Sequence, residues 1–127
     1  MHRLLTGLAA LSAVACTSLE DVRQQPFSWF SYYPVPFDNL ANCLAARSAQ
    51  LWTVTPQIQE RQGIAYVTLG EKGGSSVVAE YVVWRQADGS SLVGWRRRKI
   101  IADVIGLQST SREAADRCGR ERRTDNR

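Results

Sequence analysis

Histidine is almost missing from this chain, and its scarcity removes several kinds of chemistry. The sequence has 127 residues and one histidine, His2. Beyond His2 there is no imidazole for a Ser-His-Asp or Cys-His catalytic site, or for a metal ligand. No paired-cysteine metal motif exists, and the Gly73-Gly74 pair is expected in a hairpin turn rather than in a phosphate-binding loop. The sequence therefore predicts neither a metal site nor a cofactor.

Paired carboxylates are the catalytic groups that remain, because two acids are enough for glycoside hydrolysis. The acidic residues of the central region stand singly, on expected strand surfaces or in turns: Glu60, Glu71, Glu80, Asp88 and Asp103. Single acids in such places are usually solvated or salt-bridged surface groups. We therefore expect no catalytic residues and a protein that is not an enzyme.

The chain also lacks a strong charge of one sign and a long apolar run. Its formal net charge is +4 at pH 7, which suits an anionic envelope surface but is far below the footprint of a nucleic-acid-binding protein. The longest apolar run, Leu4–Val14, is shorter than the roughly 20 residues that span a bilayer. We expect no nucleic-acid partner and no membrane-spanning helix.

The N-terminus has the features of a secretory signal. A basic residue, Arg3, precedes the apolar run, and the small residues Ala13 and Ala15 follow it. A positive start, a short apolar core and small residues before the cleavage site define such signals. We therefore expect residues 1–15 to be a signal peptide and the protein to be exported.

The residue after the signal is a cysteine, and a small-residue run ending in Cys16 resembles the lipobox of bacterial lipoprotein precursors. The resemblance covers residues 1–16; Ala15 and Cys16 match, whereas Ala13 stands where that class usually has Leu. It implies diacylglyceryl transfer to the Cys16 thiol, cleavage before Cys16, and acylation (palmitate) of the new N-terminus.

A lipid-anchored envelope protein facing the periplasm is what this resemblance implies. Several acyl chains anchor a protein firmly, whereas one chain binds only marginally. Thr17, a residue other than Asp after the cysteine, favours the outer membrane over the inner one. One alternative is cleavage after Ala15 by an ordinary signal peptidase, which gives a plain secreted periplasmic protein. The other is an uncleaved anchor or a cytosolic chain.

The remaining two cysteines form an even pair. If Cys16 is lipidated, Cys43 and Cys118 are left in an oxidising compartment, where disulfides persist. A bridge between them would close a loop of about 75 residues and contribute roughly 4 kcal/mol in the chain-entropy model. Two independent thiols are the alternative, but the even count favours the bridge.

Two segments precede the predicted domain. Residues 16–25 are mostly polar and are interpreted as a tether. Residues 26–37 contain six of the eleven aromatic residues together with three prolines. Proline fixes φ and favours extended conformations before it, so we expect an extended aromatic arm that is neither helix nor central strand. The arm would lie on the domain as a lid, or contact the membrane interface or a partner.

A single α+β domain is expected over residues 38–120, followed by a charged tail, 121–127. A helix from Asp38 to about Trp52 is predicted, with Asp38 as its N-cap, and Pro56 ends any continuation. Five residues recur at helical spacing along one side of this helix, with Cys43 on its buried stripe: Leu40, Cys43, Leu44, Arg47 and Leu51.

Three or four antiparallel strands should follow. Alternation and β-branched residues predict strands at Gln57–Arg61 (weak), Ile64–Leu69, Val77–Gln86 and Leu92–Lys99, with a turn at residues 71–75. Both faces of this sheet carry apolar residues and need covers. The helices would supply one cover and the aromatic arm the other.

Asp88-Gly89 is a strong hairpin signal, and a two-residue turn there fixes a register. Trp84 would face Val93, Val82 would face Trp95, and Glu80 would face Arg97. The opposite face would place Tyr81 beside Arg96 and Val83 beside Gly94. A shift of one residue would turn one strand's side chains to the other face.

The C-terminal part is predicted to end in a helix. Ile100–Leu107 is apolar enough to be buried, but its pattern fits a strand or a helix. A capping box, Thr110–Glu113, opens a short helix that runs through Cys118, with Gly119 as its stop. The fold class is therefore α+β: an N-terminal helix, a three- to four-stranded antiparallel sheet, and a C-terminal helix linked to the first by Cys43–Cys118.

Two candidate binding surfaces follow. Exposed aromatics are typical of protein interfaces, and the candidates for contact with an envelope protein partner are Trp29, Phe30, Tyr32, Tyr33, Trp84 and Trp95. A basic run could bind an anionic lipid or glycan; its residues are Arg96, Arg97, Arg98 and Lys99. Side chains alternate on a strand, so only half of this run shares a face, and charge that protects a strand edge is the alternative.

Overall fold

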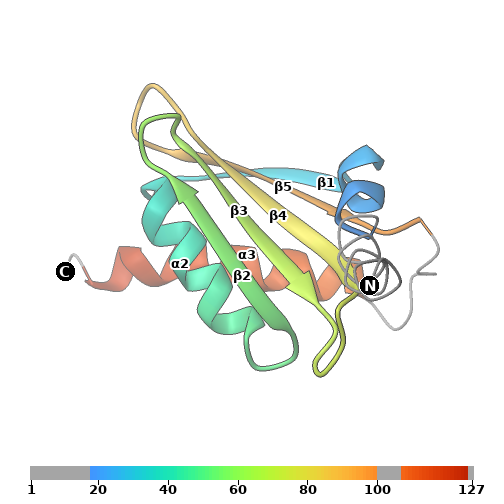
Figure 1. Cartoon of the computed structure of the whole chain (residues 1–127). Helices are drawn as coiled ribbons and strands as arrows, with labels where there is room; N and C mark the ends of the chain where they lie inside the picture. Colours follow the sequence, from blue (N-terminus) through green and yellow to red (C-terminus); the bar gives the residue numbers. More distant parts are fainter. Residues whose placement is uncertain (1–17, 100–106, 126–127) are drawn as a thin grey trace, which may run out of the picture.

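Five strands form one antiparallel sheet, and two helices cover one of its faces (Figure 1). The computed structural model describes residues 18–99 and 107–125. In chain order the elements are β1 (Trp29–Tyr33), α2 (Phe37–Ser48), β2 (Thr53–Gln59), β3 (Ile64–Gly70), β4 (Val77–Arg85), β5 (Ser91–Arg97) and α3 (Leu107–Asp125).

The order of strands across the sheet is β1-β5-β4-β3-β2. β2 to β5 follow one another as a meander, and β1 pairs with β5 at the far edge. Because β1 and β2 lie at opposite edges, α2 crosses the sheet between them (Figure 1). α3 lies beside α2 on the same face, so the α+β class is as predicted, with one strand more than expected.

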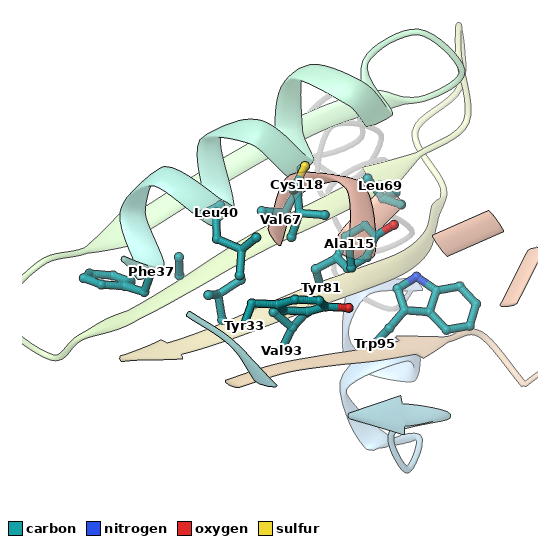
Figure 2. Packing of buried hydrophobic residues seen from close by; sticks show 14 of the residues in the cluster. Tyr33, Phe37, Leu40, Val67, Leu69, Tyr81, Val93, Trp95, Ala115 and Cys118 are labelled. Carbon is teal, nitrogen blue, oxygen red and sulfur yellow. The ribbon is translucent and has the colours of Figure 1, made fainter. Parts of the chain in front are cut away.

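The hydrophobic core lies between the two helices and the face of the sheet that they cover (Figure 2). Side chains alternate along a strand, and the alternate residues of β3, β4 and β5 that face the helices are almost fully buried: Ala65, Val67, Leu69, Ala79, Tyr81, Val83, Val93 and Trp95. Leu40 and Leu44 of α2 and Ala115 of α3 pack on them. Burying one large apolar side chain contributes about 1.5–3 kcal/mol.

A disulfide joins the two helices, as predicted. Cys43 of α2 and Cys118 of α3 are bonded, with their Cα atoms 5.8 Å apart. The bridge closes a sequence separation of 75 residues. It therefore fixes α3 to the domain at a point remote in sequence from α2.

The fifth strand comes from the segment expected as an extended aromatic arm. The sequence of β1, Trp-Phe-Ser-Tyr-Tyr, pairs with β5 from Trp29↔Trp95 to Tyr33↔Ser91. The prolines at 26, 34 and 36 flank this strand without interrupting it, so they do not prevent an edge strand. Trp29 and Tyr33 are buried, while Phe30 and Tyr32 are exposed on the other face.

The boundaries of α2 and β2 differ from the prediction. The N-cap of α2 is Pro36, which makes no side-chain cap, and not Asp38 as predicted. Asp38 lies in the first turn, where its carboxylate interacts favourably with the helix dipole. The helix ends at Ser48, so Leu51 follows it and is 66% exposed. Pro56 pairs with Val67 within β2, an edge strand, where proline is tolerated.

The β4–β5 register is one residue away from the prediction. The loop has three residues, closed by the hydrogen bond from Gln86 N to Ser90 O (2.8 Å), with Gly89 at φ 85°. A type I turn followed by a left-handed glycine is the usual three-residue hairpin loop. Trp84 therefore pairs with Leu92, Val82 with Gly94 and Glu80 with Arg96.

This shift decides which side chains enter the core. In the observed register Tyr81 pairs with Trp95, and Val83 with Val93, so all four face the helices. The predicted register would have placed Arg96 beside Tyr81, on the core side. The turn position was therefore right and the loop length wrong.

α3 is longer than the predicted C-terminal helix. It starts at Leu107 and passes through Gly119 to Asp125. Ser111, expected in a capping box, is buried inside the helix, where its Oγ donates to Gln108 O (2.7 Å) and accepts from Trp29 Nε1 (3.0 Å). The rest of Ile100–Leu107, residues 100–106, lies outside the described residues, as does the predicted signal with Cys16.

Candidate functional site

The face of the sheet turned away from α2 and α3 carries most of the candidate residues. Glu80, Val82 and Trp84 of β4 alternate onto this outer face and mark three rows across the sheet. The Glu80 row is polar, with Thr68 and Arg96 as neighbours. The Trp84 row is apolar, and the outer face therefore has one polar and one apolar end.

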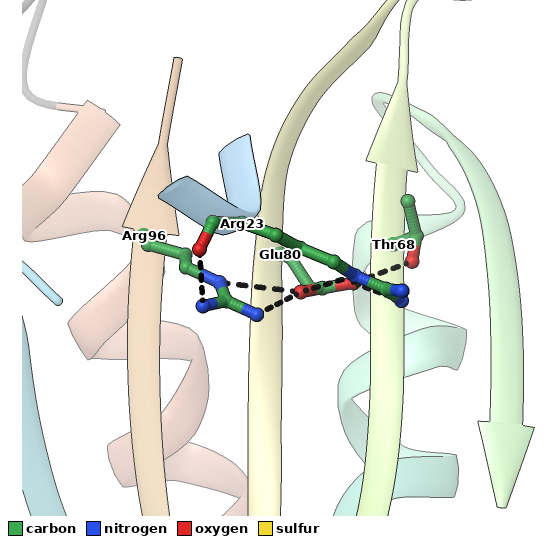
Figure 3. A network of polar contacts seen from close by, with 4 residues as sticks. All are labelled: Arg23, Thr68, Glu80 and Arg96. Carbon is green, nitrogen blue, oxygen red and sulfur yellow. Dashed lines mark hydrogen bonds and ion pairs between the residues drawn. The ribbon is translucent and has the colours of Figure 1, made fainter. Parts of the chain in front are cut away.

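Glu80 is a fully buried carboxylate held by two arginines (Figure 3). Its Oε2 accepts from Arg23 Nη2 at 3.0 Å and from Thr68 Oγ1 at 3.1 Å, and its Oε1 accepts from Arg96 Nη2 at 2.8 Å. Arg96 also donates to the carbonyl oxygen of Arg23 at 3.1 Å. A buried charge is tolerated when it is paired and hydrogen-bonded, so the network satisfies Glu80 and ties Arg23 to the sheet.

Arg23 belongs to a short helical segment, residues 18–24, that covers the polar end of the outer face (Figure 1). Residues 16–25 were expected to be a tether, yet Val22 of this segment is fully buried. Ser18 Oγ accepts a hydrogen bond from the backbone N–H of Val77 at 3.0 Å. Asp21 forms an ion pair with Arg98 at 3.6 Å.

Four aromatic side chains gather toward the apolar end of the outer face, and we call them the aromatic patch: Phe27, Phe30, Tyr32 and Trp84. The ring centroids of Phe27 and Phe30 are 4.9 Å apart, and those of Phe27 and Trp84 are 5.5 Å apart in an edge-on arrangement. Phe30 is 51% exposed and Tyr32 68% exposed, whereas Phe27 and Trp84 are half-buried.

Gly94 lets the Phe27 ring approach the backbone of β5 closely. A Cβ at position 94 would stand 2.7 Å from Cδ1 of Phe27 and 3.0 Å from Cε1 of Phe30. The Phe27 ring also lies 4.7 Å from the Arg96 guanidinium, a cation–π distance. Phe27 is therefore the member of the patch that contacts the polar network.

Two kinds of feature were not found among the described residues. Between residues 18–99 and 107–125 no group of His, Cys, Asp and Glu could hold a metal ion. Within the same ranges, no helix has both the length and the apolar character needed to cross a membrane. Models of known protein families and the sequences of curated proteins give no match to this chain. The outer face has to be interpreted from its own geometry.

Three of the six predicted partner-binding aromatics are core residues instead. Trp29, Tyr33 and Trp95 face the helices and are at most 7% exposed. Tyr33 OH donates to Asp116 Oδ1 at 2.6 Å, and burial, aided by this carboxylate, raises the pKa of Tyr33 to about 12. Phe30, Tyr32 and Trp84 are the predicted residues that share the outer face.

The basic run Arg96–Lys99 is also divided. Arg96 and Arg98 turn to the outer face, where they pair with Glu80 and Asp21. Lys99 is exposed at the end of β5, and Arg97 is half-buried. The run therefore does not form one continuous patch of four cations.

A small pocket lies on the helix side, between the C-terminal end of α2 and the first turns of α3. It measures about 60 Å³ and is lined mainly by apolar side chains, including Trp52, Leu69 and Leu107. An engineered apolar cavity that binds benzene has about 150 Å³. This pocket is therefore smaller than a cavity that holds one benzene molecule.

Two members of the outer-face site were not predicted from the sequence. Phe27 was grouped with the arm but not proposed as a contact residue, and Arg23 was placed in a tether. The sequence does contain a signal that the aromatic arm has two faces. Side chains alternate along a strand, so Phe30 and Tyr32 lie opposite to Trp29, Ser31 and Tyr33. No local pattern marks Arg23, whose partner is 57 residues away.

Proposed function

We propose that the protein is a non-catalytic lipoprotein of the bacterial cell envelope, anchored by acyl chains on Cys16 and facing the periplasm. The lipobox-like sequence ending at Cys16 supports the anchor. The Cys43–Cys118 disulfide fits an oxidising compartment. The outer membrane is the proposed location, because Thr17 follows the cysteine.

Its role, we propose, is to bind another envelope protein through the aromatic patch, as an accessory or assembly subunit. The observation that carries this proposal is the exposure of Phe30 and Tyr32, 51% and 68%, beside the half-buried Trp84. Exposed aromatics that rest on further aromatics supply rigid apolar area, and such residues dominate binding energy at interfaces. Their place on an edge strand also leaves them accessible to a partner.

Recognition of an anionic lipid or glycan through Arg96–Lys99 is the alternative, and it has less support. Arg96 is paired with a fully buried carboxylate, and Arg98 with Asp21. Release of Arg96 to an external anion would leave Glu80 buried with one charged partner fewer. Binding by this route would fall steeply with salt and disappear on charge reversal, whereas binding through the patch would be nearly independent of salt.

Affinity capture of the membrane-extracted protein, with mass spectrometry of the co-purifying proteins, tests the partner proposal. The variant Phe30→Ser/Tyr32→Ser should lose a specific partner that the wild type retains, with no change in thermal unfolding larger than that of a surface substitution. Leu51→Ser is the matched control, because Leu51 is 66% exposed but lies outside the patch. It should retain the partner.

Two results would contradict this proposal. A partner kept by Phe30→Ser/Tyr32→Ser would remove the patch from the interface. A collapse of thermal stability in that variant would make both residues part of the core. The mass of the N-terminal peptide from the same preparation decides the anchor: an acylated Cys16 supports the lipoprotein, and an unmodified one supports the plain secreted form.

A further inference from the structure

The folded domain begins very close to the proposed lipid attachment. Ser18 is 4% exposed and accepts the hydrogen bond from Val77 N. Two peptide links connect it to Cys16, and two links span at most about 7 Å. An acyl anchor on Cys16 would therefore start next to the surface of the domain, with no room for a flexible tether.

The segment after Ser18 is held by several independent contacts. Val22 is fully buried, Arg23 pairs with the buried Glu80, and Asp21 pairs with Arg98. Pulling this segment away would expose Val22 and leave Glu80 with an incomplete set of partners. These contacts make residues 18–24 a rigid connection between the anchor and the sheet.

Ser18 lies at one particular end of the molecule, which we call the proximal end. Val77, its partner, starts β4, and the turn before β4 contacts the α2–β2 connection through Lys72 Nζ and Gln50 O, 2.8 Å apart. The last residues of the β5 strand lie at the same end, where Arg98 N donates to Val78 O at 3.0 Å. The turn at residues 86–90 lies at the opposite, distal end (Figure 1).

We infer that the domain stands upright on the membrane, with the proximal end against the lipid headgroups and the distal end directed into the periplasm. This inference rests on the proposed lipidation of Cys16. The short distance that the chain can span between Cys16 and Ser18 is the main support for this orientation. The exposed side chains at the proximal end fit a headgroup layer, because they include Lys72, Lys99 and the aliphatic Leu51, with Glu71 as an opposing acid. A basic residue near an anionic bilayer surface is attracted to that surface.

The orientation also places the aromatic patch. β4 has nine residues, which span about 30 Å, and Trp84 lies near its distal end. Tyr32 belongs to the same cross-strand row, through Leu92. The exposed part of the patch would therefore face away from the bilayer, where an envelope partner can reach it without displacing lipid.

Fluorescence quenching on vesicles tests this orientation. Ser75→Cys and Ala87→Cys each introduce an exposed labelling site, one at the proximal and one at the distal end of β4. The acylated full-length protein, labelled with a fluorophore, is reconstituted in vesicles of phosphatidylethanolamine and phosphatidylglycerol that contain a headgroup nitroxide lipid. Quenching should be several-fold stronger for the label at position 75 than for the label at position 87.

A linker insertion supplies the matched control. Eight Gly and Ser residues placed between Thr17 and Ser18 leave the folded contacts intact and give the anchor a mean reach of about 15 Å. The difference in quenching between the two labels should then shrink. If the anchor alone, and not its short connection, sets the orientation, the insertion will have no effect and the inference is wrong.

The possible failures are distinguishable. Protein that floats with the vesicles but shows equal quenching at both labels retains the proposed lipoprotein function and overturns the upright orientation. Stronger quenching at position 87 overturns the orientation as well. Protein with no lipid mass on Cys16 and no flotation overturns both proposals.

Discussion

The ring of Tyr33 in β1 packs directly on the backbone of Gly119 in α3. A Cβ at position 119 would lie 2.8 Å from Cγ and 3.0 Å from Cε1 of Tyr33, and both residues are buried. One turn earlier in α3, Asp116 accepts the hydrogen bond from the Tyr33 hydroxyl. Gly119 is therefore a packing residue that brings α3 close to the edge strand.

Gly119→Ala should destabilise the fold although alanine is the better helix former. The helix propensity would favour alanine by about 1 kcal/mol, but overpacking in a core costs about 1–3 kcal/mol, and the buried Tyr33 has little room to move. We expect a net loss of about 1–2 kcal/mol in the free energy of unfolding, measured by urea denaturation. Arg120→Ala, at an exposed neighbouring position, should change it by less than about 0.5 kcal/mol. If Gly119→Ala is more stable than the wild type, the Tyr33 ring moves to accommodate the added methyl group and the prediction is wrong.

This contact explains why the C-terminal helix was predicted too short. Glycine after a helical run usually marks a stop, and nothing local distinguishes a stop from a glycine chosen for close packing. The register error has the same origin, since Asp88-Gly89 fits both a two-residue and a three-residue loop. The elements with strong periodicity, such as β3 and β4, and the Cys43–Cys118 bridge were predicted, whereas the length of α3 and the β4–β5 register were not.

Removing the Glu80 carboxylate charge should be among the most costly single changes to the outer face. Glu80→Gln leaves the guanidinium of Arg96, 13% exposed in the fold, without its ionic partner. Breaking a buried pair typically costs about 3–5 kcal/mol. We expect about 3 kcal/mol, because Arg23 is 38% exposed and can be solvated again. The free energy of unfolding from urea denaturation measures the loss.

A double-mutant cycle separates pairing from simple loss of packing. Arg96→Met should cost less in the Glu80→Gln background than in the wild type, by at least about 1 kcal/mol. Arg117→Ala is the surface control. It removes the ion pair between Arg117 and Glu113, two side chains that are each more than half exposed, and it should lower the free energy of unfolding by less than about 0.5 kcal/mol. Additive losses for Glu80 and Arg96 would mean that the two residues act independently.

The site illustrates the same limit of prediction as the fold. Phe30, Tyr32 and Trp84 could be proposed from their chemistry, but their separation from Trp29, Tyr33 and Trp95 depends on which face each residue takes. That assignment follows from the pairing of β1 with β5, across about 60 residues of chain. Glu80 appeared as a surface acid because its partners, Arg23 and Arg96, come from two other segments.

The Cys43–Cys118 bridge should account for a large part of the stability. Its closure of a 75-residue separation corresponds to about 4 kcal/mol in the chain-entropy model, and measured values are commonly about 2–4 kcal/mol. For a domain of this size 1 kcal/mol shifts the melting temperature by about 4–8 °C, so reduction should lower the melting temperature by at least about 8 °C. Cys43→Ala/Cys118→Ala should melt like the reduced protein and should not respond to reductant. A melting temperature unchanged by reduction would contradict this role.

The ionisation of Tyr33 should make the fold lose stability in alkaline solution. Burial and the hydrogen bond to Asp116 raise the pKa of Tyr33 to about 12, from 10.0 for a free tyrosine. The folded state therefore keeps this proton at a pH where the unfolded chain has released it. The stabilisation is complete below about pH 10 and is lost as the pH rises from 10 to about 12.

Tyr33→Phe isolates this contribution from that of Tyr81, whose pKa is also raised by burial. At neutral pH the variant should be less stable by about 1 kcal/mol, because the hydrogen bond to Asp116 is lost. Between pH 10 and 12 its urea midpoint should fall less steeply than that of the wild type. Absorbance at 295 nm rises as tyrosines ionise, and in the variant the step near pH 12 that the wild type shows should be absent. If the urea midpoints of the two proteins fall equally steeply between pH 10 and 12, the ionisation of Tyr33 is not coupled to folding.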